Sequence, residues 1–294
     1  MNIPTKKLAS GFEAPAYGLG LWQMGGLTTA DRTHDAREIT AIRTALEHGV
    51  THLDTAESYG DGHAEELLAR AVDGFERSKL LVATKVSAWN QSYDGVRRSL
   101  DASLKRLKMD YVDLYMLHRY PEPGLAIEDT MRAMDELVDK GLVLNIGACN
   151  LSPARFEAAQ AASKHKLVCN QVHYNLQYRE TEVRGVLKQC LELDVLLVAW
   201  RPLQKGRLGE APVVTKLAEK YGKTPAQIAI NWLVSQDQVV TISKTSNLAH
   251  LEENLGALDW TMEPEDIERI RSEYPDQQRA SDAVPLDYAA DVAV

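Results

Sequence analysis

Four ionisable side chains occur in the first half of the chain at or just after the ends of short apolar runs: Asp54, Tyr59, Lys85 and His118. A phenol can deliver a proton, and a nearby ammonium lowers its pKa from about 10 because the ammonium favours the phenolate. A carboxylate can hold that ammonium in place and offset its desolvation. An imidazole can donate a hydrogen bond to an oxygen that gains negative charge. Together the four groups suit the addition of hydride and a proton to a C=O group.

Each of these side chains also has a structural explanation when it is taken alone. Asp54 could cap a turn, and Tyr59 could be a packed aromatic residue. Lys85 could end a strand in solvent, and His118 could be hydrogen-bonded into the core. The functional interpretation therefore depends on the combination, in which Lys85 tunes the phenol, Asp54 holds Lys85 and His118 orients the carbonyl oxygen.

Short apolar runs recur along the chain and alternate with helical patterns. They span residues 16–22, 51–56, 80–85, 111–118, 142–150, 167–172, 195–200 and 239–244. Several runs are apolar nearly throughout, which is typical of strands buried on both faces. No linker or change of composition interrupts the alternation. We therefore predict the α/β class and a single (β/α)8 TIM barrel domain over residues 1–294, with a doubly wound sheet plus a second domain as the alternative.

Local signals add detail to this fold. Residues 5–15 predict a β-hairpin before the first barrel strand, which would close the lower end of the barrel. Ser152-Pro153 and Thr224-Pro225-Ala226-Gln227 predict helix starts, and Gly141 predicts a helix end. Because catalytic residues of a barrel come from the C-terminal ends of its strands, the four ionisable side chains are expected to meet at one end.

Composition limits the classes of partner. The formal net charge of −9 argues against nucleic acid and anionic membrane surfaces. Cys149, Cys169 and Cys190 lie far apart, which suits packing roles in a reducing compartment. The chain has no apolar stretch of about 20 residues, and its first ten residues do not resemble a secretory signal. A cytoplasmic protein is the resulting expectation.

The sequence around the four side chains resembles the aldo-keto reductase superfamily. The matching motifs are DTAESYG at residues 54–60, ATK at 83–85 and LH at 117–118. The resemblance extends from Tyr17 to about Asn254 and implies a catalytic tetrad of Asp54, Tyr59, Lys85 and His118, with Tyr59 as general acid. It also implies NADP(H) as the hydride donor and a small-molecule carbonyl compound as the substrate. Because the family is often monomeric, the resemblance further implies a monomer or weak oligomer.

The resemblance further implies residues for each part of the cofactor. The nicotinamide end would contact Gly20, Leu21, Trp22, Asp54, Asn150, Gln171 and Trp200, and the pyrophosphate would contact Arg201, Pro202, Leu203, Lys205 and Gly206. The adenosine end would contact Ser243, Lys244, Thr245, Ser246, His250, Glu253 and Asn254. His250 stands where the family commonly has an arginine, and a largely neutral imidazole binds phosphate more weakly. This departure leaves use of NAD(H) beside NADP(H) open.

The substrate pocket is expected to be lined by Trp22, Trp89 and Tyr120 beside Tyr59 and His118, which predicts mostly apolar walls. The C-terminal tail, residues 275–294, is a further candidate for its lining. One alternative function is a cofactor-binding regulatory subunit related to the same family, with little or no turnover. A second is a barrel enzyme that forms a Schiff base through Lys85 or uses a metal. The eight histidines show no spacing typical of metal ligands, so no metal is expected.

Overall fold

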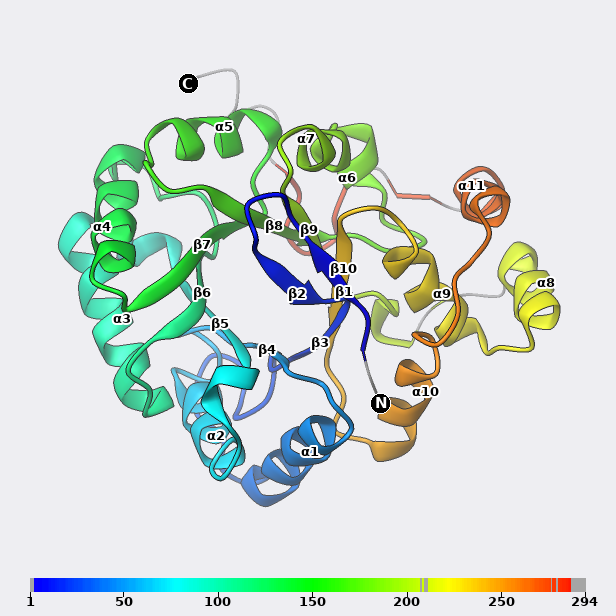
Figure 1. Ribbon diagram of the computed structural model, residues 1–294, viewed down its shortest axis with the longest axis horizontal. Helices are drawn as coiled ribbons and strands as arrows, with labels where there is room; N and C mark the ends of the chain where they lie inside the picture. The colour runs from blue at the N-terminus through cyan, green and yellow to red at the C-terminus, as the bar shows by residue number, and fades with distance from the viewer. Residues whose placement is uncertain (1–2, 207, 209–210, 276, 279, 287–294) are drawn as a thin grey trace.

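The computed structural model describes residues 3–206, 208, 211–275, 277–278 and 280–286. Parallel strands form a closed barrel in the order β10-β3-β4-β5-β6-β7-β8-β9 (Figure 1). The strands are β3 (Tyr17–Gly20), β4 (His52–Asp54), β5 (Leu81–Val86), β6 (Val112–Leu117), β7 (Val143–Cys149), β8 (Leu167–His173), β9 (Leu196–Trp200) and β10 (Val239–Ser243). Each strand overlaps one predicted run, so the predicted (β/α)8 TIM barrel is confirmed.

Helices surround the ring of strands and cover its outer face (Figure 1). They are α1 (Asp35–Glu47), α2 (His63–Ala71), α3 (Tyr93–Leu107), α4 (Ile127–Asp139), α5 (Pro153–Ala161), α6 (Glu180–Val183), α7 (Val186–Glu192), α8 (Pro212–Tyr221), α9 (Pro225–Val234), α10 (Leu248–Leu255) and α11 (Pro264–Glu273). Short 3₁₀ turns add η1 (Arg77–Lys79), η2 (Ala88–Asn90) and η3 (Gln204–Gly206). Among the described residues, no helix has the length and apolar composition needed to cross a membrane.

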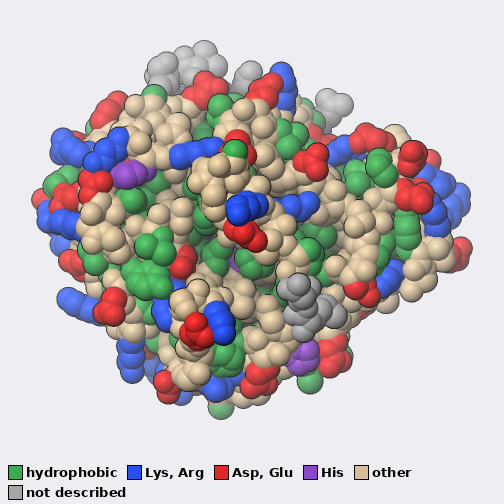
Figure 2. All heavy atoms as spheres, in the orientation of Figure 1, with side chains coloured by type: hydrophobic (Ala, Val, Ile, Leu, Met, Phe, Trp, Pro, Cys, Tyr) green, Lys and Arg blue, Asp and Glu red, His purple; other side chains and the backbone are tan. Residues whose placement is uncertain are grey.

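The predicted N-terminal hairpin consists of β1 (Thr5–Lys7) and β2 (Glu13–Pro15), which pair antiparallel. It lies across the centre of the ring in Figure 1, at the N-terminal ends of the barrel strands. Leu8 and Ala14 are buried in one apolar cluster with inward-facing barrel residues such as Met116. In Figure 2, the face around the hairpin carries interspersed Lys or Arg and Asp or Glu side chains. The hairpin thus closes the lower end of the barrel with an apolar inner side and a polar outer side.

The C-terminal segment crosses to the upper rim and is fixed there by one buried carboxylate. Glu180, at the start of α6, accepts hydrogen bonds from the backbone N–H of Ser281 at 2.8 Å and of Leu286 at 3.0 Å. The same segment bridges to the loop before α6, since Arg179 N donates to Gln278 O at 3.0 Å. Residues 280–286 are therefore positioned beside the C-terminal end of β8.

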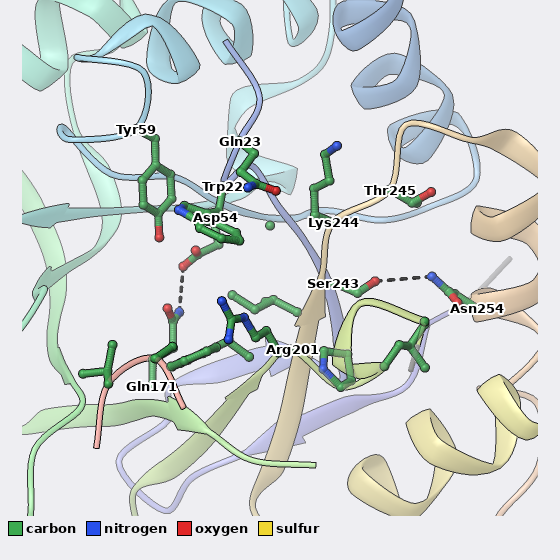
Figure 3. A pocket seen from close by; sticks show the side chains of 18 of the residues that line it. Trp22, Gln23, Asp54, Tyr59, Gln171, Arg201, Ser243, Lys244, Thr245 and Asn254 are labelled. Carbon is green, nitrogen blue, oxygen red and sulfur yellow. Dashed lines mark hydrogen bonds between the residues drawn. The ribbon is translucent and has the colours of Figure 1, made fainter. Parts of the chain in front are cut away.

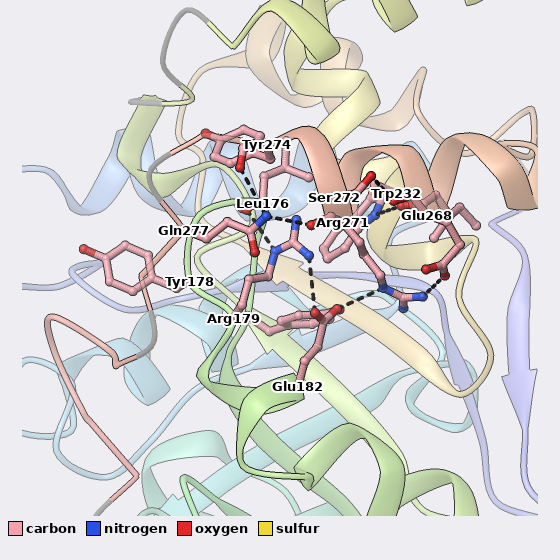
Figure 4. A network of polar contacts seen from close by, with 12 residues as sticks. Leu176, Tyr178, Arg179, Glu182, Trp232, Glu268, Arg271, Ser272, Tyr274 and Gln277 are labelled. Atoms are coloured by element: carbon pink, nitrogen blue, oxygen red, sulfur yellow. Dashed lines mark hydrogen bonds and ion pairs between the residues drawn. The ribbon is translucent and has the colours of Figure 1, made fainter.

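A polar network ties α6 to the helices that precede this segment (Figure 4). The Arg179 guanidinium lies 4.4 Å from the ring centre of Trp232 and donates to the Leu176 carbonyl at 2.9 Å. Glu182 accepts from Arg179 at 3.4 Å and from Arg271 at 3.0 Å. Because these side chains come from α6, α9 and α11 or the loops beside them, the network holds three separate helices together.

Candidate active site

A cavity of about 1280 Å³ opens at the C-terminal ends of the barrel strands. Its walls include Gly20, Asp54, His118, Asn150, Gln171, Trp200 and Ser243, which lie at or within two residues of the C-terminal ends of seven different strands. Figure 3 shows its two ends: Tyr59, Asp54 and Gln171 gather at one end, while Ser243, Thr245 and Asn254 gather at the other. A pocket of this length has room for an elongated cofactor and a small second molecule.

The Lys85 ammonium lies at the bottom of the first end and is fully buried. It donates to Asp54 Oδ1 at 2.6 Å, to the Thr55 carbonyl at 2.7 Å and to the Tyr59 hydroxyl at 3.4 Å. Three acceptors match the three N–H donors of an ammonium group. The buried charge is therefore fully satisfied, and its position beside the phenol is fixed.

Local structure explains how these side chains meet. Asp54 and Lys85 lie on the neighbouring strands β4 and β5, and both point into the barrel. Tyr59 lies in the loop after β4, in a turn where its backbone N–H donates to the Ala56 carbonyl at 3.1 Å. Glu57, in the same loop, accepts from Ser87 N at 2.8 Å and so ties this loop to the end of β5. The phenol is thereby held above the ammonium.

The pKa of Tyr59 corrects one expectation from the sequence. Burial raises the pKa of this phenol to about 12, although the charge of Lys85 acts in the lowering direction that the sequence predicts. The loss of solvation in the cavity outweighs the ammonium, because the phenolate is the form that burial disfavours. For Lys85, burial lowers the pKa, but the Asp54 carboxylate outweighs it and raises the pKa above its ordinary value. At neutral pH the site therefore holds a protonated phenol beside an ammonium.

His118 faces the same phenol from β6. The two rings meet edge to face with their centroids 5.6 Å apart. Burial, together with the charges of Lys85 and Arg119, lowers the pKa of His118 to about 3. The imidazole is therefore neutral at physiological pH and carries one N–H donor, which can point at an oxygen bound between the two rings.

The amides predicted at the ends of β7 and β8 also lie in the cavity. Gln171 Nε2 donates to Asp54 Oδ2 at 2.8 Å (Figure 3), and within the described residues no donor reaches Gln171 Oε1. Asn150 Oδ1 accepts from the Trp200 indole N–H at 3.1 Å. The far side of Trp200 is braced by His173, whose ring stacks on it at 4.3 Å. An aromatic face and an available amide oxygen are thus held at fixed positions in this wall.

The opposite end of the cavity is polar. Asn254 is buried, and its amide donates to Tyr17 Oη at 3.2 Å and to Ser243 Oγ at 3.3 Å. Lys244 is exposed and lines the cavity with Ser243 and Thr245. The N-terminus of α10 begins just after these residues and contains His250. A cation, hydroxyl groups and a helix N-terminus make this end suited to a phosphate group.

The structure brings most of the predicted site residues together, with four exceptions. Leu21 is fully buried, and its backbone N–H donates to the Asp54 carbonyl at 2.8 Å, so it supports the wall from behind. Ser246 and Tyr120 are not among the residues that line the cavity. Tyr120 lies instead against Arg155, whose guanidinium is 5.0 Å from its ring centre. The side chain of Lys205, in η3, lies outside the described part of the structure.

Sequence reasoning missed several residues that line the cavity. They are Gln23, Leu27, Thr28, Ser58, Arg119, Leu208, Pro225, Ala226 and Ile242. Arg119 directly follows His118, so its position at a strand end was a signal that could have identified it. Ala283 and Val284 belong to the C-terminal tail, which the sequence offered as a candidate lining segment, and the path of this tail depends on contacts with α6. No local pattern in the sequence indicates such a path.

Comparison with known proteins gives one consistent family. A family model described as the aldo/keto reductase family matches residues 16–274. The chain is 33% identical over 267 residues to methylglyoxal reductase YeaE of Escherichia coli, an alignment that covers 89% of this chain and 91% of that protein. It is 30% identical to glyoxal reductase of Bacillus subtilis, with 90% of this chain and 91% of the relative covered.

Solved structures show the same likeness. The thermostable aldo-keto reductase Tm1743, in complex with the inhibitor epalrestat, superposes with a TM-score of 0.89 at 39% identity, covering 92% of this chain and 99% of that one. An aldo/keto reductase from Klebsiella pneumoniae, in complex with NADP and acetate, gives a TM-score of 0.82 at 30% identity. That match covers 95% of this chain and 98% of the other.

Proposed function

Because the chain belongs to the aldo/keto reductase family, we propose that it reduces aldehydes and ketones to alcohols with NADPH, and that Tyr59 is the proton donor. The observation that carries the proposal is the contact of the buried Lys85 ammonium with both Asp54 Oδ1, at 2.6 Å, and the Tyr59 hydroxyl, at 3.4 Å. This arrangement lies at the bottom of a cavity that also offers hydrogen-bond donors to a carbonyl oxygen.

Tyr59, Lys85 and His118 each have a separate role in the transfer of the proton to the carbonyl oxygen. NADPH, when bound, supplies the hydride that adds to the carbonyl carbon. The Tyr59 O–H bond breaks as negative charge develops on the carbonyl oxygen, and the proton forms the new O–H bond of the alcohol. The phenolate left behind faces the Lys85 ammonium, which stabilises it across 3.4 Å. The neutral His118 imidazole donates its N–H to the same oxygen and fixes its position.

The residues of the cavity fit a nicotinamide cofactor. The free amide oxygen of Gln171 and the amide of Asn150 suit a carboxamide, which has one donor group and one acceptor. Trp200, braced by His173, offers a flat wall for the nicotinamide ring. At the other end Lys244, Ser243, Thr245 and the N-terminus of α10 suit the adenosine phosphate. Both ends belong to the same barrel, so we assign catalysis and cofactor binding to one domain.

The preference for NADPH over NADH depends on the end of the cavity that suits a phosphate group, next to Lys244. His250 is exposed at the first turn of α10, and Lys244 is the cation that lines this end. Among the described residues one lysine and no arginine line this end, so we predict that NADPH binds about tenfold more tightly than NADH, and that NADH still supports turnover. Titration of tryptophan fluorescence with each cofactor measures the ratio, since Trp200 lies in the cavity wall. Equal affinities would contradict a phosphate site at Lys244.

Substitution of Tyr59 by Phe tests the proton donor. Tyr59→Phe should lower kcat for 4-nitrobenzaldehyde by about 10²–10⁴-fold, the usual contribution of a general acid. NADPH binding should stay within about threefold of the original, because the phenol oxygen is the group removed. Tyr111→Phe is a matched control, since it removes a phenol oxygen next to β6 outside the cavity. Full activity in Tyr59→Phe would show that another group delivers the proton.

A further inference from the structure

Arg119 is a cation at the rim of the cavity that the proposed reaction does not use. It directly follows His118, lines the cavity and is exposed. Its charge lies close enough to the His118 ring to contribute to the low pKa of that imidazole. Within the described part of the chain, no carboxylate approaches its guanidinium to 4.0 Å. An arginine in such a position has five N–H donors that are available to a bound molecule.

The position of Arg119 in the barrel separates it from the phosphate groups of a cofactor. β6, which leads to Arg119, lies opposite β10 in the closed ring, with three strands between them on either side. The residues suited to phosphate, Ser243 and Lys244, end or follow β10. A cofactor that reaches from Trp200 to α10 therefore leaves Arg119 on the other side of the substrate position.

The carboxylates near the substrate position do not neutralise the charge of Arg119. Asp54 and Glu253 are the carboxylates among the described residues that line the cavity. Asp54 is neutralised by Lys85, and Glu253 lies on α10 at the far end. Arg201, the other arginine that lines the described part of the wall, is paired with Asp282 at 3.1 Å. One unpaired positive charge thus faces the space next to His118.

From these observations, and resting on the function proposed above, we propose that Arg119 selects carbonyl substrates that carry a carboxylate. The guanidinium can form two parallel N–H···O bonds to one carboxylate, a geometry that matches its planar fork. It would hold the far end of the molecule while Tyr59 and His118 hold the carbonyl oxygen. A protein of formal net charge −9 repels anions at long range, so an acidic substrate needs such a local cation. A carboxylate suits a single guanidinium better than a phosphate ester, which carries about −1.5 to −2 at pH 7.

The test compares two aldehydes that differ in charge, 4-carboxybenzaldehyde and methyl 4-formylbenzoate. The ratio of kcat/KM for the acid to that for the ester is measured for the wild-type protein and for Arg119→Gln. Comparison of ratios removes the difference in intrinsic reactivity between the two aldehydes. We expect the ratio to fall about tenfold or more in Arg119→Gln, chiefly through a higher KM for the acid, because charged hydrogen bonds are lost. Arg119→Lys should recover part of the ratio.

Arg98→Gln is the matched control, because it makes the same charge change on the exposed side of α3 and should leave the ratio as in the wild type. An unchanged ratio in Arg119→Gln would overturn the inference while reduction of the ester still supports the proposed function. A wild-type protein that reduces neither aldehyde would refute both. The ratio of kcat/KM for glyceraldehyde 3-phosphate to that for glyceraldehyde is measured in the same two proteins. If Arg119→Gln lowers this ratio more than it lowers the ratio for the benzoate pair, the anion that Arg119 selects is a phosphate and not a carboxylate.

Discussion

At the scale of single residues, the site depends on a buried positive charge. The Lys85 ammonium has no exposed surface and is balanced by Asp54 at 2.6 Å. Burial of an ammonium is costly unless it is paired and hydrogen-bonded. The types and spacing of these residues predicted the pair and its place beside Tyr59. They could not predict the pKa of Tyr59, because the pKa depends on how completely the surrounding loops exclude water.

Removal of the Asp54 charge should therefore affect both activity and stability. Asp54→Asn leaves the Lys85 ammonium without its anion, and we expect a loss of about 3–5 kcal/mol in the free energy of unfolding. Urea denaturation followed by fluorescence measures it. Asp259→Asn breaks the exposed ion pair with Lys223, whose atoms are 2.9 Å apart, and should cost less than about 1 kcal/mol. Similar losses in the two variants would contradict a special role for the buried pair.

At the scale of secondary structure elements, local signals located some helix ends well. The side chain of Ser152 caps α5, and Thr224 forms a capping box with Gln227 at α9. Both were predicted because the residue types and spacing are specific. Helices α8 and α10 were not predicted. α10 has eight residues, so a helical pattern can repeat only about twice along it. Such short helices are stabilised mostly by packing, which a local pattern does not show.

The contact between α6 and the C-terminal segment gives a prediction at this scale. Glu180→Gln removes the charge that accepts from Ser281 N and Leu286 N, so residues 280–286 should be held less firmly. Because Ala283 and Val284 line the cavity, KM for 4-nitrobenzaldehyde should rise about threefold to tenfold, with kcat changed less than twofold. Glu192→Gln, at the exposed end of α7, is the control and should change neither constant. A fall in kcat at constant KM would contradict this role of Glu180.

At the scale of the whole molecule, the barrel could be predicted because eight apolar runs alternate with helical patterns. The upper rim could not be predicted, since it depends on contacts between distant parts of the chain, such as Glu180 and Ser281, which are 101 residues apart in sequence.

Buried histidines affect the stability of the whole molecule. His52 and His173 are 1% and 4% exposed, and burial, the largest cause in each, lowers the pKa of each to about 4.

These histidines should make the fold sensitive to acid. Each folded-state pKa lies below the ordinary value of about 6.5, so unfolding takes up protons and stability is lost as the pH falls below 6.5. Between pH 8 and pH 5 the loss is about 2 kcal/mol for each of the two groups. Urea denaturation at both pH values measures it. His118, whose pKa burial lowers to about 3, adds a loss of similar size. His52→Leu should therefore remove about a third of the total, whereas His34→Gln, which changes an exposed histidine, should retain all of it. An unchanged pH dependence in His52→Leu would contradict the prediction.

The hairpin of β1 and β2 has a consequence for the order of events in turnover. It closes the lower end of the barrel with apolar side chains, so the cavity opens at the upper face of the described structure. Trp200 ends β9 and Gln171 lies two residues before the end of β8, while Trp89 and Arg119 lie in the segments that follow β5 and β6. Two molecules bound in this cavity would enter and leave through the same opening, so the molecule bound deeper must bind first and be released last.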